Sequence, residues 1–292
     1  MFRPKEIIFI PTTKCNLHCT HCFVTRTNAE YDVGFALSFI EDCARHGVER
    51  VGFSGGEPFL NLGFVEKVCQ KVVDLDLYFG RIMTNAVWWK TENDLSDKLN
   101  ALFDSGFDGE ICISLDKFHN QDLKKVRTFI DTAINLGQPK DLISFASVRD
   151  GEDETTKKML KYFAQYELKT DRIDYVPADF TNKKFWQAKS WLKDDFCKGP
   201  GNVFYVHNNG DISACCGYAN EEPELIIGNI VRDNYESLMK NAEEKAILKI
   251  AYGGKFGLEI KKYADKVPGI TDNHCLFCRW LIEESRALRQ AQ

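Results

Sequence analysis

Short apolar runs alternate with amphipathic stretches from the start of the chain to about residue 177. The apolar runs predict strands at Ile7–Pro11, Arg50–Ser54, Tyr78–Thr84, Glu110–Leu115, Leu142–Val148 and Arg172–Val176. The stretches between them have helical periodicity and predict helices at Val33–His46, Leu62–Asp74, Glu92–Ser105, Gln121–Leu136 and Glu152–Tyr166. Strands that alternate with helices form parallel sheets through right-handed crossovers. The pattern therefore predicts an α/β fold, a partial and open (β/α)6 barrel of the TIM type.

The alternation ends at Pro177, and a different pattern follows. The expected segments are a β-hairpin (Val203–Val206 and Ile212–Ala214 around the turn Asn208–Asp211), a helix near Asn234–Ile250, a glycine-rich loop at Gly253–Gly257 and a helix after Cys278. The Asn-Gly pair in the turn supplies the positive φ that tight hairpins need. We therefore expect a barrel domain at 1–178 and a small domain, a hairpin plus helix, at 179–292.

Composition narrows the class of protein. The chain has 292 residues, 44% of them hydrophobic, which is enough for a large core, and a formal charge of −5. This acidic balance argues against a nucleic-acid partner. The sequence shows neither a run long enough to span a membrane nor a signal peptide, so we expect a cytoplasmic protein without a membrane partner. Disulfides are rare in that compartment, so its 11 cysteines favour metal or cluster ligation.

Three of these cysteines follow the first predicted strand. Cys15, Cys19 and Cys22 have the spacing C-x3-C-x2-C, at the strand end where active sites of parallel α/β folds are built. Three thiolates can hold three irons of a 4Fe–4S cube and leave the fourth iron open to an outside ligand. A zinc site that also uses His18 and His21 is the alternative from spacing alone.

Polar motifs follow the next three predicted strands. They are Ser54-Gly55-Gly56-Glu57-Pro58, Thr84-Asn85 and Ser114-Leu115-Asp116. With the cysteine loop they resemble the radical SAM superfamily over residues 5–177. The resemblance implies that Gly55, Gly56, Glu57 and Pro58 hold the methionine part of S-adenosylmethionine, and that Asn85, Ser114 and Asp116 lie near its ribose. It also implies that the cluster cleaves this cofactor reductively and that the resulting 5′-deoxyadenosyl radical abstracts hydrogen from a substrate.

Five further cysteines lie beyond the barrel, at Cys197, Cys215, Cys216, Cys275 and Cys278. Their layout around the hairpin resembles a SPASM domain of the short, single-cluster twitch type. The resemblance implies a second [4Fe–4S] cluster on Cys197, Cys215, Cys275 and Cys278; a four-cysteine zinc site is the alternative. The remaining three, Cys43, Cys69 and Cys112, fall in predicted helices and a strand and are expected to be small buried hydrophobes.

The chain is most similar to the radical SAM peptide epimerases of epipeptide biosynthesis. The similarity rests on its size, the Cys215-Cys216 pair after the hairpin and the run Ser114–His119. It implies a ribosomally made precursor peptide as substrate, a flavodoxin- or ferredoxin-type electron donor, and conversion of an L-residue to a D-residue. Asn202 departs from the pattern of these epimerases, because an acidic residue is expected at this position.

The alternatives are a maturase that forms a thioether or carbon–carbon crosslink, and a non-catalytic iron–sulfur electron-transfer or sensing protein. A SAM pocket at Glu57 argues against the last.

The adjacent cysteines are expected to differ in role. Side chains alternate between the two faces of a strand, so neighbours are not expected to serve one cluster. Cys216 follows Ile212 and Ala214 in the hairpin register, whereas Cys215 follows Ser213. We expect Cys215 to be the ligand and Cys216 to be the hydrogen donor. A core-facing Cys216 and the reversed assignment remain alternatives.

Overall fold

A computed structural model describes residues 2–149, 153–197 and 202–290. The chain forms two compact units. The larger comprises Glu6–Tyr175 and His207–Gly210; the smaller comprises Met1–Lys5, Val176–Val206 and Asp211–Gln292. The domain limits 1–178 and 179–292 stay a prediction. No helix among the described residues combines the length and apolar character needed to cross a membrane.

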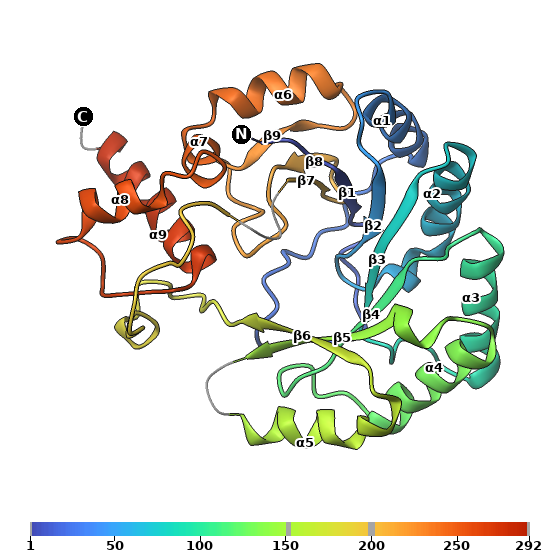
Figure 1. Cartoon of the computed structure of the whole chain (residues 1–292). Helices are drawn as coiled ribbons and strands as arrows, with labels where there is room; N and C mark the ends of the chain where they lie inside the picture. Colours follow the sequence, from blue (N-terminus) through green and yellow to red (C-terminus); the bar gives the residue numbers. More distant parts are fainter. Residues whose placement is uncertain (1, 150–152, 198–201, 291–292) are drawn as a thin grey trace. The chain divides into compact units, whose positions relative to one another are not determined.

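Six parallel strands and five helices build the larger unit (Figure 1). In chain order they are β1 Glu6–Phe9, α1 Val33–Arg45, β2 Arg50–Phe53, α2 Leu62–Asp74, β3 Tyr78–Thr84, α3 Glu92–Asp104, β4 Glu110–Ser114, α4 Leu123–Asn135, β5 Ile143–Arg149, α5 Glu154–Tyr162 and β6 Lys169–Asp174. The strands pair in sequence order from β1 to β6, and β1 and β6 do not pair with each other among the described residues. The predicted open partial barrel is confirmed.

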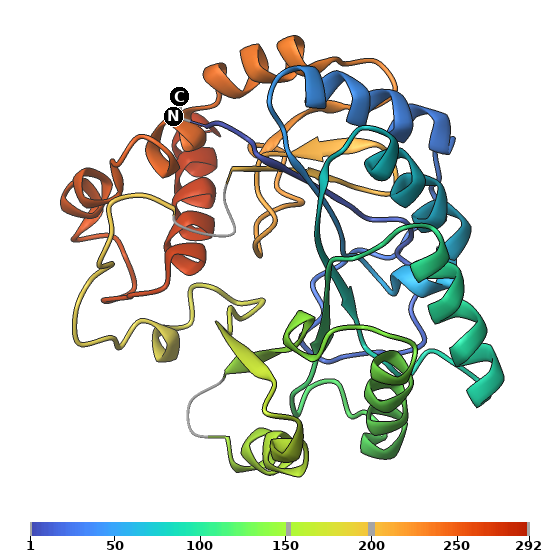
Figure 2. The ribbon, with the colours of Figure 1, turned by 45° about the vertical axis from the view of Figure 1, so that its right-hand side comes forward.

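Helices cover the convex side of this sheet. Figures 1 and 2 show α1 to α4 side by side along its outer face. Apolar residues such as Ile82 and Ile111, both fully buried, fill the core. On β3, Arg81 forms ion pairs with Glu110 of β4 (3.2 Å) and Asp171 of β6 (3.0 Å). The long Arg81 side chain thus connects three strands of the sheet across its inner strands.

The described part of the smaller unit has three strands with antiparallel pairing and four α-helices. Its elements are β7 Val203–Val206, β8 Asp211–Ser213, β9 Ile226–Asn229, α6 Tyr235–Glu244, α7 Ala246–Ala251, α8 Phe256–Tyr263 and α9 His274–Gln290. β8 pairs with both β7 and β9 in antiparallel fashion, so the predicted hairpin is confirmed. The sequence pattern did not predict β9 or α8.

Several element boundaries differ from the sequence prediction. The helix expected near Asn234–Ile250 is two helices, because Lys245 adopts an extended conformation between α6 and α7. The last helix begins at His274, before Cys275, and not after Cys278. The helix expected from Glu152 is described only from residue 153, since its expected start lies outside the described residues; α5 ends at Tyr162 and a 3-10 turn follows.

Candidate active site

The cysteines of the first motif lie in the loop that follows β1. Cys15 and Cys19 are half-buried and Cys22 is exposed. The Cys22 amide donates to the Cys19 carbonyl (3.1 Å), which makes a tight turn between these two residues. Arg26 donates to the Leu17 carbonyl and lies 3.4 Å from His18 Nε2. Its own backbone and Arg26 therefore help to hold the loop in place.

The three thiols are electrostatically coupled. Burial raises the pKa of the Cys19 thiol to about 12, and the neighbouring Cys15 and Cys22 thiols add to the shift. Burial also raises the pKa of Cys15. Without a metal, ionising these thiols is unfavourable. A nearby positive charge stabilises the thiolate form, and metal ions supply such a charge. The donor set fits an iron–sulfur cluster with three protein ligands.

Two glycines let the turn after β2 contact this loop. The Gly56 amide donates to the Thr12 carbonyl (3.0 Å), and the Glu57 amide donates to the Lys14 carbonyl (2.8 Å). A Cβ on Gly56 would lie 2.2 Å from the Lys14 carbonyl oxygen. Gly55 has φ +123°, which disfavours other residues, and a Cβ there would meet Ile10 Cγ2 at 2.7 Å. The close contact between these two backbone segments therefore explains why positions 55 and 56 are glycines.

The Glu57 carboxylate is fully buried and bound by protein donors. It accepts hydrogen bonds from Thr84 Oγ1 (2.9 Å) and from the Asn85 amide (2.8 Å). Burial raises the pKa of Glu57 to about 7, although these donors oppose the shift. Pro58 then begins a 3-10 helix, with Glu57 as its N-cap. In this structure Glu57 joins the ends of β2 and β3; its contact with S-adenosylmethionine stays a prediction.

Asn85 connects the end of β3 to the cysteine loop. Its Nδ2 donates to Asn16 Oδ1 (2.8 Å) and lies 3.6 Å from Cys15 Sγ. Gln121 Nε2 donates to the backbone carbonyls of Asn85 (2.6 Å) and Ser114 (2.8 Å). The structure therefore places Asn85 next to the first cysteine, and Gln121 connects Asn85 with Ser114 at the end of β4.

Asp116 holds a histidine that the sequence reasoning did not assign. Its carboxylate accepts from His119 Nδ1 (2.7 Å) and from the amides of Phe118 and Val148 (3.0 Å each). Burial acts to raise the pKa of Asp116, but the hydrogen bond and charge of His119 outweigh it and hold the pKa low. The ring of His119 lies 4.8 Å from that of His21, between Cys19 and Cys22. The Asp-x-x-His spacing of Asp116 and His119 after a predicted strand could have indicated this contact.

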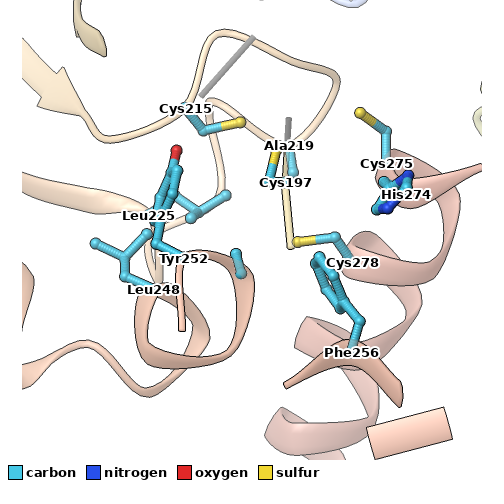
Figure 3. Close-up of a pocket in the computed structure, with 11 residues that line it drawn as sticks. Cys197, Cys215, Ala219, Leu225, Leu248, Tyr252, Phe256, His274, Cys275 and Cys278 are labelled. Carbon is cyan, nitrogen blue, oxygen red and sulfur yellow. The ribbon is translucent and has the colours of Figure 1, made fainter. Parts of the chain in front are cut away.

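Four cysteines of the smaller unit line one pocket. Cys197, Cys215, Cys275 and Cys278 surround the same space in Figure 3, together with Tyr252 and His274. Cys275 and Cys278 lie in the first turns of α9, and residues three apart share a helix face. Burial raises the pKa of Cys278 well above its usual value, and the thiols of Cys215, Cys275 and Cys197 add to the shift. This donor set fits a metal centre with four thiolate ligands.

Cys216 is not among the residues that line this pocket in the described part of the chain. Cys215 Sγ accepts a hydrogen bond from the Gly217 amide (3.2 Å), which fixes the turn that contains the pair. However, β8 ends at Ser213, so strand alternation does not separate the two side chains. The different positions of Cys215 and Cys216 come from the turn. Their roles stay predictions.

Two family profiles match the chain. The Radical SAM superfamily matches residues 9–178, which is more than half of the chain. An iron–sulfur cluster-binding domain, SPASM, matches residues 197–261. Cys275 and Cys278 lie beyond the second match.

Individual proteins match at low identity. GTP 3′,8-cyclases of Lactiplantibacillus plantarum and Limosilactobacillus fermentum are 25% and 24% identical over 77% and 65% of this chain. The chain matches 66% and 60% of their lengths, slightly less than two thirds. Among solved structures, native anSMEcpe with bound AdoMet and Cp18Cys peptide has a TM-score of 0.59 at 18% identity, over 84% of this chain and 83% of that one. Streptococcus suis SuiB bound to precursor peptide SuiA has a TM-score of 0.53 at 15% identity, over 95% and 76%.

Proposed function

The chain belongs to the radical SAM superfamily, and from this we propose that it converts an L-residue of a ribosomally made peptide to its D-epimer. Its SPASM domain adds a second iron–sulfur site to the barrel. SuiB, which shares this fold, was solved with a precursor peptide, and this supports a peptide substrate here. The observation that carries the proposal is the Cys215-Cys216 pair, in which only one cysteine lines the pocket.

In the proposed barrel site, Cys15, Cys19 and Cys22 hold a cluster with one open iron. When bound, that cluster supplies the electron that cleaves S-adenosylmethionine to a 5′-deoxyadenosyl radical. Gly55, Gly56, Glu57 and Pro58 position the methionine part of that cofactor. Asn85, Ser114 and Asp116, at the ends of β3 and β4, position its ribose. The chain thereby orients the reacting groups and excludes water.

In the proposed reaction, the peptide Cα would lose its hydrogen to the radical that the bound cofactor supplies, and Cys216 would return hydrogen to the opposite face. The Cys216 S–H bond breaks as the new Cα–H bond forms, and a thiyl radical remains on Cys216. Restoring the thiol takes one electron and one proton. The proposed source of the electron is a flavodoxin- or ferredoxin-type donor, and the proton comes from water.

The proposal predicts the behaviour of a Cys216→Ala variant with its peptide in deuterated water. Wild type should place one solvent deuterium at the inverted Cα, because the thiol proton exchanges with solvent. The variant should still form 5′-deoxyadenosine but produce little D-residue. Cys69→Ala, a fully buried cysteine of α2, is the matched control and should epimerise as wild type does. Chiral amino-acid analysis and mass spectrometry measure the outcome.

Unimpaired epimerisation by Cys216→Ala would remove Cys216 from the reaction. A wild-type product lighter by two hydrogens would assign the chain to the crosslinking maturases. GTP is the control substrate, because GTP 3′,8-cyclases are among the matching relatives. Conversion of GTP at a rate that exceeds peptide turnover would replace the peptide proposal.

A further inference from the structure

The C-terminal end of α7 binds both segments that carry the first two pocket cysteines. The Cys197 amide donates to the Ala251 carbonyl (2.7 Å). The next residue, Tyr252, donates from its hydroxyl to the carbonyl of Ala214 (2.8 Å), which directly precedes Cys215. Two consecutive residues therefore connect chain segments that are far apart in sequence. Figure 3 shows the Tyr252 hydroxyl directed toward the loop that carries Cys215.

The Tyr252 side chain is held firmly in this position. Its ring packs against Phe2, with the ring centroids 5.3 Å apart. Its hydroxyl also accepts from the Asn202 amide (3.3 Å). Asn202 has φ 62°, a left-handed conformation that asparagine tolerates, and its Oδ1 accepts from the Arg3 amide (2.8 Å). The hydroxyl thus has a donor on one side and an acceptor on the other.

The segment that leads into the Cys215-Cys216 turn is fixed by hydrogen bonds of Ala214, whereas the Gly217 amide holds the turn beyond the pair through Cys215 Sγ. The pairing of β8 with β9 shifts register between Ile212 and Ser213, and β8 ends there. Beyond that point the Ala214 amide donates to the Leu225 carbonyl (3.0 Å), and the Ala214 carbonyl accepts from Tyr252. The hydroxyl of Tyr252 therefore holds the carbonyl side of the peptide plane between Ala214 and Cys215. The orientation of this plane sets the direction in which the Cys215 side chain leaves the backbone.

We propose that Tyr252 is a positioning residue that selects Cys215, and not Cys216, as the auxiliary ligand. It does so by holding the Ala214 carbonyl, so that Cys215 faces the pocket and Cys216 stays outside it. This inference rests on the proposed auxiliary site, whose ligands are Cys197, Cys215, Cys275 and Cys278. It adds a residue outside the ligand set that keeps the proposed hydrogen donor separate from the cluster.

Thiol labelling of the Tyr252→Phe protein tests whether Tyr252 selects Cys215 as the ligand. Reconstituted, anaerobic holoprotein receives a short pulse of N-ethylmaleimide, and the labelled cysteines are mapped by mass spectrometry after denaturation. In wild type, Cys216 should be labelled and Cys215 protected. In Tyr252→Phe, Cys215 should gain label while Cys216 becomes partly protected. Iron release to a chelator should be about 10-fold faster, as for the loss of other groups that orient metal ligands.

The pattern of labelling separates selection from general loosening. Loosening would expose all four ligands alike, whereas a ligand exchange exposes Cys215 and leaves Cys197, Cys275 and Cys278 protected. Tyr31→Phe is the matched control, because the buried Tyr31 hydroxyl has no hydrogen-bond partner among the described residues. A Tyr252→Phe protein with the wild-type pattern, or with equal exposure of all four, would overturn the inference. A wild type with labelled Cys215 would instead overturn the proposed ligand set.

A second variant covers the case in which Tyr252→Phe does not load iron. Replacing Tyr252 with 3-fluorotyrosine keeps the ring and the hydroxyl and makes the hydroxyl a stronger donor. Cys215 should then be labelled no faster than in wild type, and Cys216 should stay fully reactive. Faster labelling of Cys215 in this protein would contradict the role of the hydroxyl.

Discussion

At the scale of residues, the barrel thiols show why a bare thiolate set is unfavourable in this site. The Cys19 thiolate is disfavoured by burial and by the two neighbouring thiols, so an isolated thiolate set is unstable there. A cluster reverses this balance because iron stabilises the thiolate form. A thiol with a raised pKa is protonated in the bare protein, so cluster binding must release this proton, and that cost lowers the net affinity at neutral pH.

We predict that changing Cys15, Cys19 and Cys22 together to Ala abolishes 5′-deoxyadenosine formation. The reason is that no thiolate would remain to hold the cluster whose fourth iron is open to S-adenosylmethionine. The measurement is chromatography of anaerobic reactions with S-adenosylmethionine and a strong reductant. Cys43→Ala, a fully buried cysteine of α1, should retain the activity. Wild-type accumulation of 5′-deoxyadenosine by the triple variant would refute the assigned site.

The residues of the site were predictable to different degrees. The cysteine motifs are local, so their spacing alone could identify them. The contact of His119 with His21 joins residues far apart in sequence, and the hydrogen bond of Tyr252 to Ala214 does so as well. Neither contact has a local sequence signal. Such partners become visible only when the fold brings separate strand ends or helix ends together.

At the scale of elements, the end of β1 and the turn after β2 depend on each other. The backbone hydrogen bonds of Gly56 and Glu57 hold the loop that leads to Cys15. The space between these two segments admits no side chain at position 56. The geometry of the cysteine loop therefore depends on a glycine of another motif.

We predict that Gly56→Ala destabilises the cluster-free protein by about 1–3 kcal/mol, because the added methyl group meets a backbone oxygen. Gly63→Ala is the control. Gly63 lies in the first turn of α2 with no atom within 4 Å of an added Cβ, so alanine should stabilise the protein by about 0.5–1 kcal/mol. Urea unfolding of both variants compares the two effects. Equal stability of the two would show that the loop can shift away from position 56.

Elements with strong apolar patterns were predicted best. β3 and α2 have the predicted limits; buried positions recur at helical spacing through α2, whereas in β3 only Ile82 and Thr84 near its end are buried. β6 begins at Lys169, earlier than expected, since this outer strand of the parallel sheet is largely exposed and carries alternating charges. α9 was placed too late because its first turn is occupied by cysteines, which lack a helical signature.

At the scale of the whole molecule, the two cysteine sets predict the metal content. Three barrel thiols and four pocket thiols make two separate sites. We predict that reconstituted wild type binds two [4Fe–4S] clusters, about eight irons per chain. The double variant Cys275→Ala and Cys278→Ala should keep about four irons, because the barrel site is untouched. Iron and zinc analysis measures this, and one cluster plus one zinc in wild type would exclude the second cluster.

The arrangement of the pocket cysteines also has a consequence for the unfolded chain. Cys197 and Cys278 are about 80 residues apart, and a cluster that binds both would act as a covalent cross-link across that interval. Closing a loop of this length removes conformational freedom from the unfolded ensemble worth about 4–5 kcal/mol in the chain-entropy account. An electron-transfer centre placed in this way would also be the main cross-link of the smaller unit. Loss of the metal would then be coupled to unfolding of this unit.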